Sequence, residues 1–312
     1  MIVDLDTRLW SRSDDLGDEL GVAVRRSAST RWLAPDASPE AYTGAMATVD
    51  AAMLVGFRSD LIRGALPEAP LRAAVEKSQG RLFFARAIDP TARDAVNEVD
   101  SARDAGAVAL WLDPAMQGFH PSSTPAMRVF DRAEANQLPV LVGWSGPAPA
   151  SMRLEYARPF LLDEVARAFP RLSIVISGFG FPFVHETLAM LAKHDRVFTT
   201  TAAIAARPWD LLNTLQSARD HGIDRKIFFA SGFPFDSPAR AIESIYGING
   251  LIHGTPLPSI ARSILREIVE RDAISLLGLG TPPIARDRDA RRMLARELPY
   301  ESPHLGLTGD SL

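Results

Sequence analysis

The chain has 312 residues, of which 46% are hydrophobic, with a formal net charge of -4 and no cysteine. Acidic and basic residues are interleaved, which favours neither nucleic acid nor a membrane surface as a partner. The lack of cysteine excludes disulfides, thiolate metal ligands and a cysteine nucleophile. Because no signal segment and no apolar run of bilayer length occurs, we expect a soluble cytoplasmic protein.

Eight short apolar runs recur along the chain, and a segment with helical spacing follows each of them. The runs cover residues 2–10, 50–57, 80–89, 107–113, 138–146, 172–180, 196–203 and 226–234. Near-continuous apolar strands that alternate with helices indicate a parallel sheet buried on both faces. This pattern predicts an α/β fold, and its eight units favour a (β/α)8 TIM barrel over an open sheet.

The domain organisation follows from what interrupts these units. No Pro-, Gly- or Ser-rich linker separates them, so we expect residues 1–285 to form a single TIM-barrel domain. Residues 286–312 are rich in Arg and Asp and then in Pro, Gly and Ser, which predicts a tail that is partly extended or disordered. In such a barrel the site lies at the C-terminal ends of the strands.

The first run, IVDLDTRLW, ends in charged residues. Asp6 and Arg8 are two positions apart, so in a strand their side chains share one face. One interpretation is an anion or oxyanion site in which Arg8 donates and Asp6 orients it or acts as a general base. The other is a buried ion pair with no catalytic role. The sequence leaves both open.

Several stretches in order resemble the amidohydrolase-related family, typified by aminocarboxymuconate-semialdehyde decarboxylase. The resemblance extends from residue 2 to about residue 280. It rests on IVDLDTRLW, ARAIDP, GAVALWLDPAMQGFHP, RAEANQLPVLVGWSG, YARPFLLDEVARAFPRLSIVISGFGFP, DRKIFFASGFPF and AISLLGLG. It implies a TIM barrel of the amidohydrolase type, and it makes a homodimer the expected assembly.

The family normally holds a divalent metal with four histidines and an aspartate at the ends of strands one, five, six and eight. The residues that match these ligands are Asp6, Arg8, Gly143, Gly178 and Gly232. Glycines supply no side-chain donor, and Arg8 would add a positive charge at the position of the cation. We therefore expect no metal at the usual site, no other cofactor and no metal-activated water.

Replacing three side chains by glycine leaves space at the rim, so we expect a pocket reshaped for a larger ligand, with sequence drift as the alternative. Trp111 takes the place of a lysine that the family often carries, and it offers a stacking surface. Asp113 follows on the same face as a candidate acid or base. Alternatively, Asp113 caps the loop that begins with its Asp-Pro step.

Further candidates for substrate contact come from the ends of the other runs. His120 can shuttle protons or belong to the family's usual loop. Trp10 and Trp144 line the pocket or pack between barrel and helices. Ser145 is a candidate hydrogen-bond donor, and the proline at residue 147 argues against a nucleophile in a G-x-S-x-G turn.

Two later positions complete this set. His185 follows the sixth run, where it reaches the mouth of the barrel or packs on its own helix. Residues 199–201 are threonines whose hydroxyls alternate along a strand, so at least one of them, taken as Thr200, should face the pocket.

These residues lead to three functional hypotheses. The first is a metal-independent enzyme that acts by proton transfer, as a lyase, cyclase or decarboxylase, on a small conjugated or aromatic carbonyl or carboxylate compound. In it Arg8 stabilises an oxyanion, and Asp6 or Asp113 moves the proton. The second is a non-catalytic pseudoenzyme that binds a metabolite or a partner subunit. The third is a hydrolase with atypical metal ligands. An open pocket that exposes these charges favours the enzyme, whereas a filled, paired centre favours the pseudoenzyme.

Overall fold

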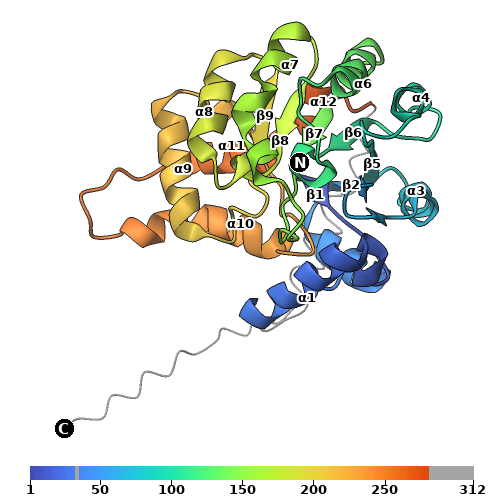
Figure 1. The fold of residues 1–312 in the computed structure, drawn as a ribbon. Coiled ribbons are helices and arrows are strands. Elements are labelled where there is room, and N and C mark those ends of the chain that lie inside the picture. The colour runs from blue at the N-terminus through green and yellow to red at the C-terminus, as the bar shows by residue number, and fades with distance from the viewer. Residues whose placement is uncertain (32–34, 281–312) are drawn as a thin grey trace.

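The computed structural model describes residues 1–31 and 35–280, which form a barrel of eight parallel strands surrounded by helices (Figure 1). The strands are β1 (Val3–Thr7), β2 (Ala51–Val55), β5 (Leu82–Ala87), β6 (Ala109–Leu112), β7 (Val140–Val142), β8 (Ile174–Ile176), β9 (Val197–Thr200) and β10 (Ile227–Phe228). Each lies within one of the eight apolar runs, so the predicted (β/α)8 barrel is confirmed. The predicted tail, and the domain boundary at residue 285, lie outside the described residues.

The barrel closes between its last strand and its first. The Leu5 amide donates to the Phe229 carbonyl at 3.2 Å, and the Gly232 amide donates to the Asp6 carbonyl at 3.0 Å. Asp4 supports the contact between these two strands. Its buried carboxylate accepts a hydrogen bond from the Ser231 amide at 3.0 Å and another from the Ser231 hydroxyl at 2.5 Å. Burial outweighs these bonds and raises the pKa of Asp4 to about 7.

Helices follow the strands and cover the outside of the barrel. They are α1 (Asp18–Arg31), α2 (Pro39–Ala45), α3 (Glu68–Lys77), α4 (Ala95–Asp100), α5 (Pro114–Gln117), α6 (Thr124–Ala135), α7 (Asp163–Ala168), α8 (Val184–Lys193), α9 (Pro208–Asp220), α10 (Pro238–Gly247), α11 (Arg262–Glu270) and α12 (Ala273–Leu277). Proline, whose fixed φ suits a first helical turn, begins several of them. None of the helices in residues 1–31 and 35–280 combines the length and apolar character needed to cross a bilayer.

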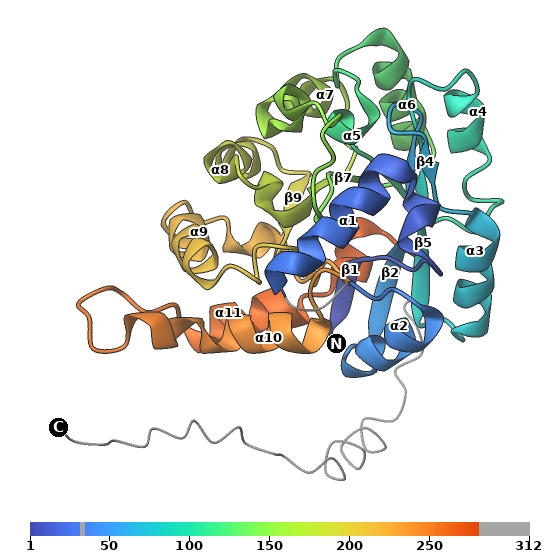
Figure 2. The ribbon, with the colours of Figure 1, turned by 60° about the horizontal axis from the view of Figure 1, so that its bottom comes forward.

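Two connections shape the C-terminal rim. A small hairpin of β3 (Arg58–Ser59) and β4 (Gly64–Ala65) follows β2. Helix α1 follows β1 and is seen in front of the barrel in Figure 2, where it meets the loop after β7 through a hydrogen bond from Ser151 to Glu19. The ends of β6, β7, β8 and β9 lie around another part of the rim, because these four strands are consecutive neighbours in the sheet.

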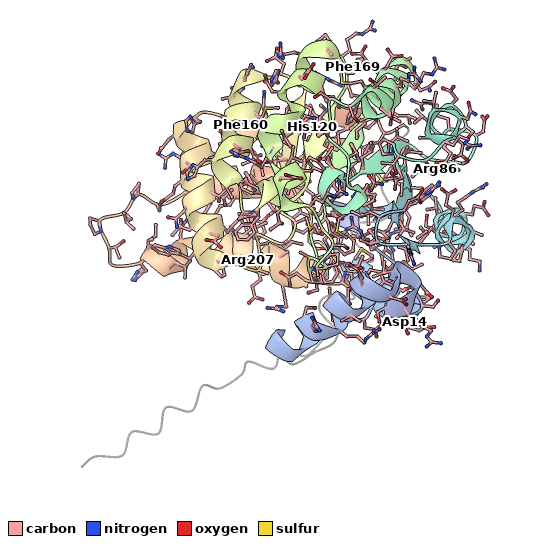
Figure 3. The ribbon with its side chains drawn as sticks, in the orientation of Figure 1. Asp14, Arg86, His120, Phe160, Phe169 and Arg207 are labelled. Carbon is pink, nitrogen blue, oxygen red and sulfur yellow. The ribbon has the colours of Figure 1, made fainter. Side chains whose placement is uncertain are left out.

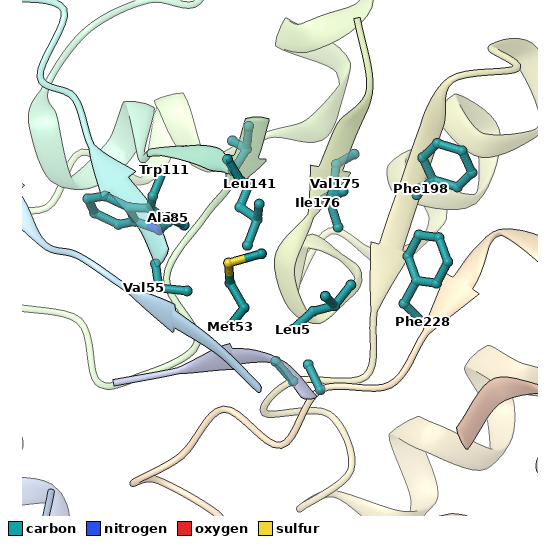
Figure 4. Packing of buried hydrophobic residues seen from close by; sticks show 14 of the residues in the cluster. Leu5, Met53, Val55, Ala85, Trp111, Leu141, Val175, Ile176, Phe198 and Phe228 are labelled. Atoms are coloured by element: carbon teal, nitrogen blue, oxygen red, sulfur yellow. The ribbon is translucent and has the colours of Figure 1, made fainter. Parts of the chain in front are cut away.

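The barrel interior is filled by apolar side chains, as Figure 4 shows. Five of these side chains come from five different strands and are each at most 4% exposed, namely Leu5, Met53, Trp111, Leu141 and Val175. The interior is thus a packed core and not a pore, as is usual for this fold. The core gives the rim a rigid base on which the ends of the strands hold their side chains.

Candidate functional site

Asp6 and Arg8 lie at the end of β1, where the strand is irregular. Asp4 pairs with Ala52 and Thr7 pairs with Leu54, so three steps along β1 correspond to two along β2. Such a bulge interrupts the alternation of faces on which the sequence prediction relied. The predicted pair nevertheless forms, and Arg8 Nη1 lies 2.5 Å from Asp6 Oδ1.

The pair is buried and enclosed by aromatic rings. Arg8 has no exposed surface, and its Cζ lies 4.4 Å from the ring centroid of Trp144 and 5.7 Å from that of Trp111. Asp6 also accepts a hydrogen bond from Ser177 at 2.8 Å, whereas Arg8 Nε and Nη2 have no hydrogen-bond partner among the described residues. These contacts match the interpretation of a buried ion pair that fills the barrel centre. A catalytic role for either residue stays a prediction.

The three glycines leave little space at the barrel centre itself, although Gly143 and Gly178 also line a larger cavity at the rim. The space left there is only about 10 Å³, lined by Asp6, Trp111, Gly143, Thr200 and four other residues, and a water molecule needs roughly 10–15 Å³. Main chain and small side chains occupy the rest. A Cβ at Gly178 would lie 2.6 Å from the Ala202 carbonyl oxygen, and one at Gly232 would lie 3.2 Å from Ser145 Oγ.

This arrangement does not fit the divalent metal that the resemblance implies. The carboxylate of Asp6 is already bound to a guanidinium, and glycines at the remaining positions have no side-chain donor. Across residues 1–31 and 35–280, no three His, Asp or Glu side chains are grouped so that they could hold a metal. Any reaction at this site therefore has to be carried out by other residues.

Replacing Gly178 by alanine should be more destabilising than the same change at Gly222. Both glycines have a positive φ, +57° and +66°, but only Gly178 has atoms within contact distance of the added Cβ. We expect the strain alone to cost about 1 kcal/mol at Gly222, and the additional clash to bring Gly178→Ala to about 2–4 kcal/mol. Urea unfolding of both variants measures the difference, and equal losses would show that the main chain around Gly178 can adjust.

A larger cavity lies beside the barrel centre at the C-terminal rim. It has a volume of about 120 Å³ and is enclosed by the segments that follow β6, β7, β8 and β9. Five residues singled out from the sequence line it, namely Asp113, Gly143, Trp144, Ser145 and Gly178. This is the place where the structure brings a carboxyl, a hydroxyl and an aromatic ring to one open space.

Asp113 combines a structural contact with an unused oxygen. Its Oδ1 accepts hydrogen bonds from the amides of Ala115 and Met116, both at 2.9 Å, and so caps α5 as the Asp-Pro step predicted. Its Oδ2 is buried and has no hydrogen-bond partner in the part of the chain that the structure describes. Burial raises the pKa of Asp113 to about 6, partly offset by the two amides and the charge of Arg8. An acid or base function in this pH range is therefore chemically available.

The predicted aromatic residues have different positions. Trp144 lines the cavity, and its indole donates to the Pro147 carbonyl at 2.9 Å. Trp111 is fully buried and donates to the Gly143 carbonyl at 2.9 Å. Trp10 packs on Phe235, with ring centroids 6.1 Å apart, and is not among the residues that line the cavity. Trp111 and Trp10 thus have packing contacts rather than open faces.

The predicted histidines lie outside the cavity lining. His120, labelled in Figure 3, is exposed. It bonds to Ser122, and its ring lies 5.9 Å from that of Tyr156, which does line the cavity. His185 is exposed on the first turn of α8. Thr200 is buried and its hydroxyl accepts the Gly178 amide at 3.1 Å, so it supports the loop after β8. It faces the small central space rather than the cavity.

Several cavity residues were not predicted. Ser177 follows β8 directly, and Arg158, Phe181 and Arg207 come from the loops after β7, β8 and β9. Ser177 is a polar residue inside the run 172–180, directly after the strand, so the rule that strand ends carry the site would have selected it. Arg207 stands seven residues beyond the end of β9, where no sequence pattern marks it.

Comparison with known proteins agrees with this fold. The family model described as Amidohydrolase matches residues 3–267. The chain belongs to the amidohydrolase family. No curated protein sequence matches the chain.

Solved structures of this amidohydrolase-family fold cover nearly the whole chain. An uncharacterized TIM-barrel protein from Bordetella bronchiseptica has a TM-score of 0.69 and 18% identity, covering 89% of this chain and 98% of that one. A zinc-bound amidohydrolase from Burkholderia multivorans has a TM-score of 0.65 and 13% identity, covering 90% and 100%. 5-Carboxyvanillate decarboxylase from Sphingomonas paucimobilis has a TM-score of 0.61 and 14% identity, covering 89% and 99%. At these identities the likeness concerns the fold.

Proposed function

We propose that this protein is an enzyme that moves a proton next to the carbonyl group of a small conjugated or aromatic acid. The reaction is of the lyase, cyclase or decarboxylase type and needs no metal. The observation that carries the proposal is the buried Oδ2 of Asp113, which has no hydrogen-bond partner within residues 1–31 and 35–280 while its residue lines the cavity. A similar fold occurs in 5-carboxyvanillate decarboxylase, whose name indicates an aromatic carboxylate as its substrate.

Asp113 acts as the base in the proposed step. In the lyase or cyclase form of the step, Oδ2 takes a proton from a C–H bond next to the substrate carbonyl, the electrons of that bond form an enolate, and the proton then returns to another carbon or to a leaving group, which restores the carboxylate. In the decarboxylase form, the C–C bond to the carboxylate breaks as CO2 leaves, and the protonated Asp113 gives its proton to the carbon that is left. With a pKa of about 6, Asp113 is mostly ionised at neutral pH and can serve both halves of this exchange.

Ser145 is the proposed donor to the enolate oxygen. It lines the cavity, and its hydroxyl oxygen lies 3.4 Å from Arg8 Nη1. Arg8 does not line the cavity, so its charge acts through Ser145 and across the ring of Trp144 rather than by direct contact. This differs from the role predicted from the sequence, in which Arg8 itself binds the oxyanion. A fixed positive charge beside a developing oxyanion lowers the barrier because no reorganisation is needed.

The proposal is tested by assaying purified protein with a panel of conjugated and aromatic acids after dialysis against a chelator. Absorbance and proton NMR report turnover, and elemental analysis reports the metal content of the same sample. We expect turnover of at least one acid with far less than one equivalent of metal per chain. Activity that returns only after zinc or manganese is added would contradict the proposal.

A second candidate is a non-catalytic protein that binds such an acid. The buried contact between Asp6 and Arg8 favours it, because a paired and filled barrel centre does not need chemistry to explain it. The same panel separates the two candidates. An acid that binds to the cavity but is not converted, and that exchanges no proton with solvent, would support the binding protein.

A further inference from the structure

We propose that Arg207 binds a carboxylate group of the ligand and holds it on the side of the cavity away from Asp113. The inference extends the proposed function, since it names which group of the substrate is recognised and where. It concerns the same 120 Å³ cavity, to which Arg207 contributes from the loop between β9 and α9.

Arg207 carries a positive charge that the surrounding chain does not neutralise. Within residues 1–31 and 35–280, no carboxylate lies within ion-pair distance of its guanidinium. Its Nη1 donates to the Ala203 carbonyl at 3.1 Å, and its Cζ lies 4.4 Å from the ring centroid of Phe181. Arg158, the other arginine in the lining, is different, because both its Nε and Nη2 donate to Glu186.

The surroundings of Arg207 suit a planar anion. A guanidinium that rests on an aromatic face still directs its N–H groups outward in its own plane. In Arg207, the N–H groups other than the one bonded to Ala203 can match the two oxygens of a carboxylate. Met152, Leu162 and Phe181 give the cavity apolar walls on which a conjugated or aromatic body can rest. An uncompensated arginine beside such walls therefore predicts an acid with a flat apolar body, and not a sugar or a simple alcohol.

The strand order sets the orientation of this ligand. Asp113 follows β6 and Arg207 follows β9, with β7 and β8 between them. Neighbouring strands are about 4.8 Å apart, so the two strand ends are separated by about 14 Å along the sheet. In this proposal the carboxylate held by Arg207 is a different group from the one that reacts at Asp113, since the two residues come from strands that are not neighbours. A decarboxylation at Asp113 would need a second carboxyl group on the substrate.

Benzoate and benzamide, which differ mainly in charge, test this assignment as probes. We expect benzoate binding, measured by isothermal titration calorimetry, to weaken at least tenfold in Arg207→Met and to change less than threefold in Arg158→Met. Benzamide should bind wild type more weakly than benzoate and should not respond to Arg207→Met. Arg207→Gln repeats the test with a polar side chain, and circular dichroism confirms that each variant is folded.

The assignment would be overturned if benzoate did not bind wild type, or if it bound the wild type and both Arg207 variants equally. Because these titrations need no turnover, they also separate this inference from the proposed function. A protein that binds benzoate through Arg207 but converts no acid would keep the carboxylate site and lose the enzymatic proposal. Turnover of an acid, together with benzoate binding that Arg207→Met does not change, would keep the enzymatic proposal and overturn the carboxylate site.

Discussion

Replacing Asp6 by asparagine is expected to lower the free energy of unfolding by about 3–5 kcal/mol, the usual cost of removing one partner from a buried ion pair. The loss should be large here because Arg8 is fully buried and two of its nitrogens already have no hydrogen-bond partner in residues 1–31 and 35–280. Without the carboxylate of Asp6, the charge of Arg8 would remain buried in the barrel, next to the Ser145 hydroxyl and two aromatic rings and within the electrostatic reach of Asp113. Urea unfolding monitored by circular dichroism measures the change.

Two control variants make this prediction specific. Asp14→Asn breaks an exposed pair with Arg25, and should cost no more than about 1 kcal/mol, as is typical of surface ion pairs. The double variant Asp6→Leu with Arg8→Met removes both charges, and should recover most of the stability that Asp6→Asn loses. A loss below about 1 kcal/mol in Asp6→Asn would contradict a structural ion pair at the barrel centre.

Replacing Asp113 by asparagine is expected to reduce turnover by about 10²–10⁴-fold, the range that a positioned general base contributes. Asparagine keeps an oxygen that can accept the amides of Ala115 and Met116, so the cap of α5 should survive. Because the amide cannot accept the substrate proton, the chemical step is lost while the fold is retained. Turnover of an acid found by the panel assay, together with the melting temperature, measures both effects.

The pH dependence gives an independent check on this role. Burial raises the pKa of Asp113 to about 6, so the ionised base forms as the pH rises through this value. Turnover by wild type should therefore increase from pH 5 to pH 7 and level off above. His185→Asn, which changes an exposed residue outside the cavity lining, should show the wild-type profile. If Asp113→Asn kept turnover within tenfold of wild type, Asp113 would not be the base.

The fold could be predicted from the sequence because its signals are repeated and local. Each of the eight strands lies within a short apolar run, and burial on both faces of a parallel strand makes such runs apolar throughout. The irregularity of β1 could not be predicted, since a bulge depends on how Asp4 and Thr7 pair with β2. Asp6 and Arg8 still meet because they lie at the end of the strand, where side chains are less constrained by the sheet.

The candidate site could be predicted only in part, and for physical reasons. Asp113 and Ser145 closely follow a strand, and so the position of the strand identifies them. The space around Gly178 and Gly232 could not be predicted, because main-chain atoms of distant segments fill it. Arg207 comes from a long loop, and its place in the cavity depends on contacts with Ala203 and Phe181 that no spacing rule describes.

The central claim, proton transfer by Asp113 without a metal, is tested most directly by hydrogen–deuterium exchange into the substrate. Proton NMR in D₂O, with a chelator present, follows the C–H signals next to the carbonyl of a conjugated acid. Wild type should exchange deuterium into that position, and Asp113→Asn should not. Exchange by both proteins at equal rates, or exchange by wild type only after zinc or manganese is added, would contradict the account.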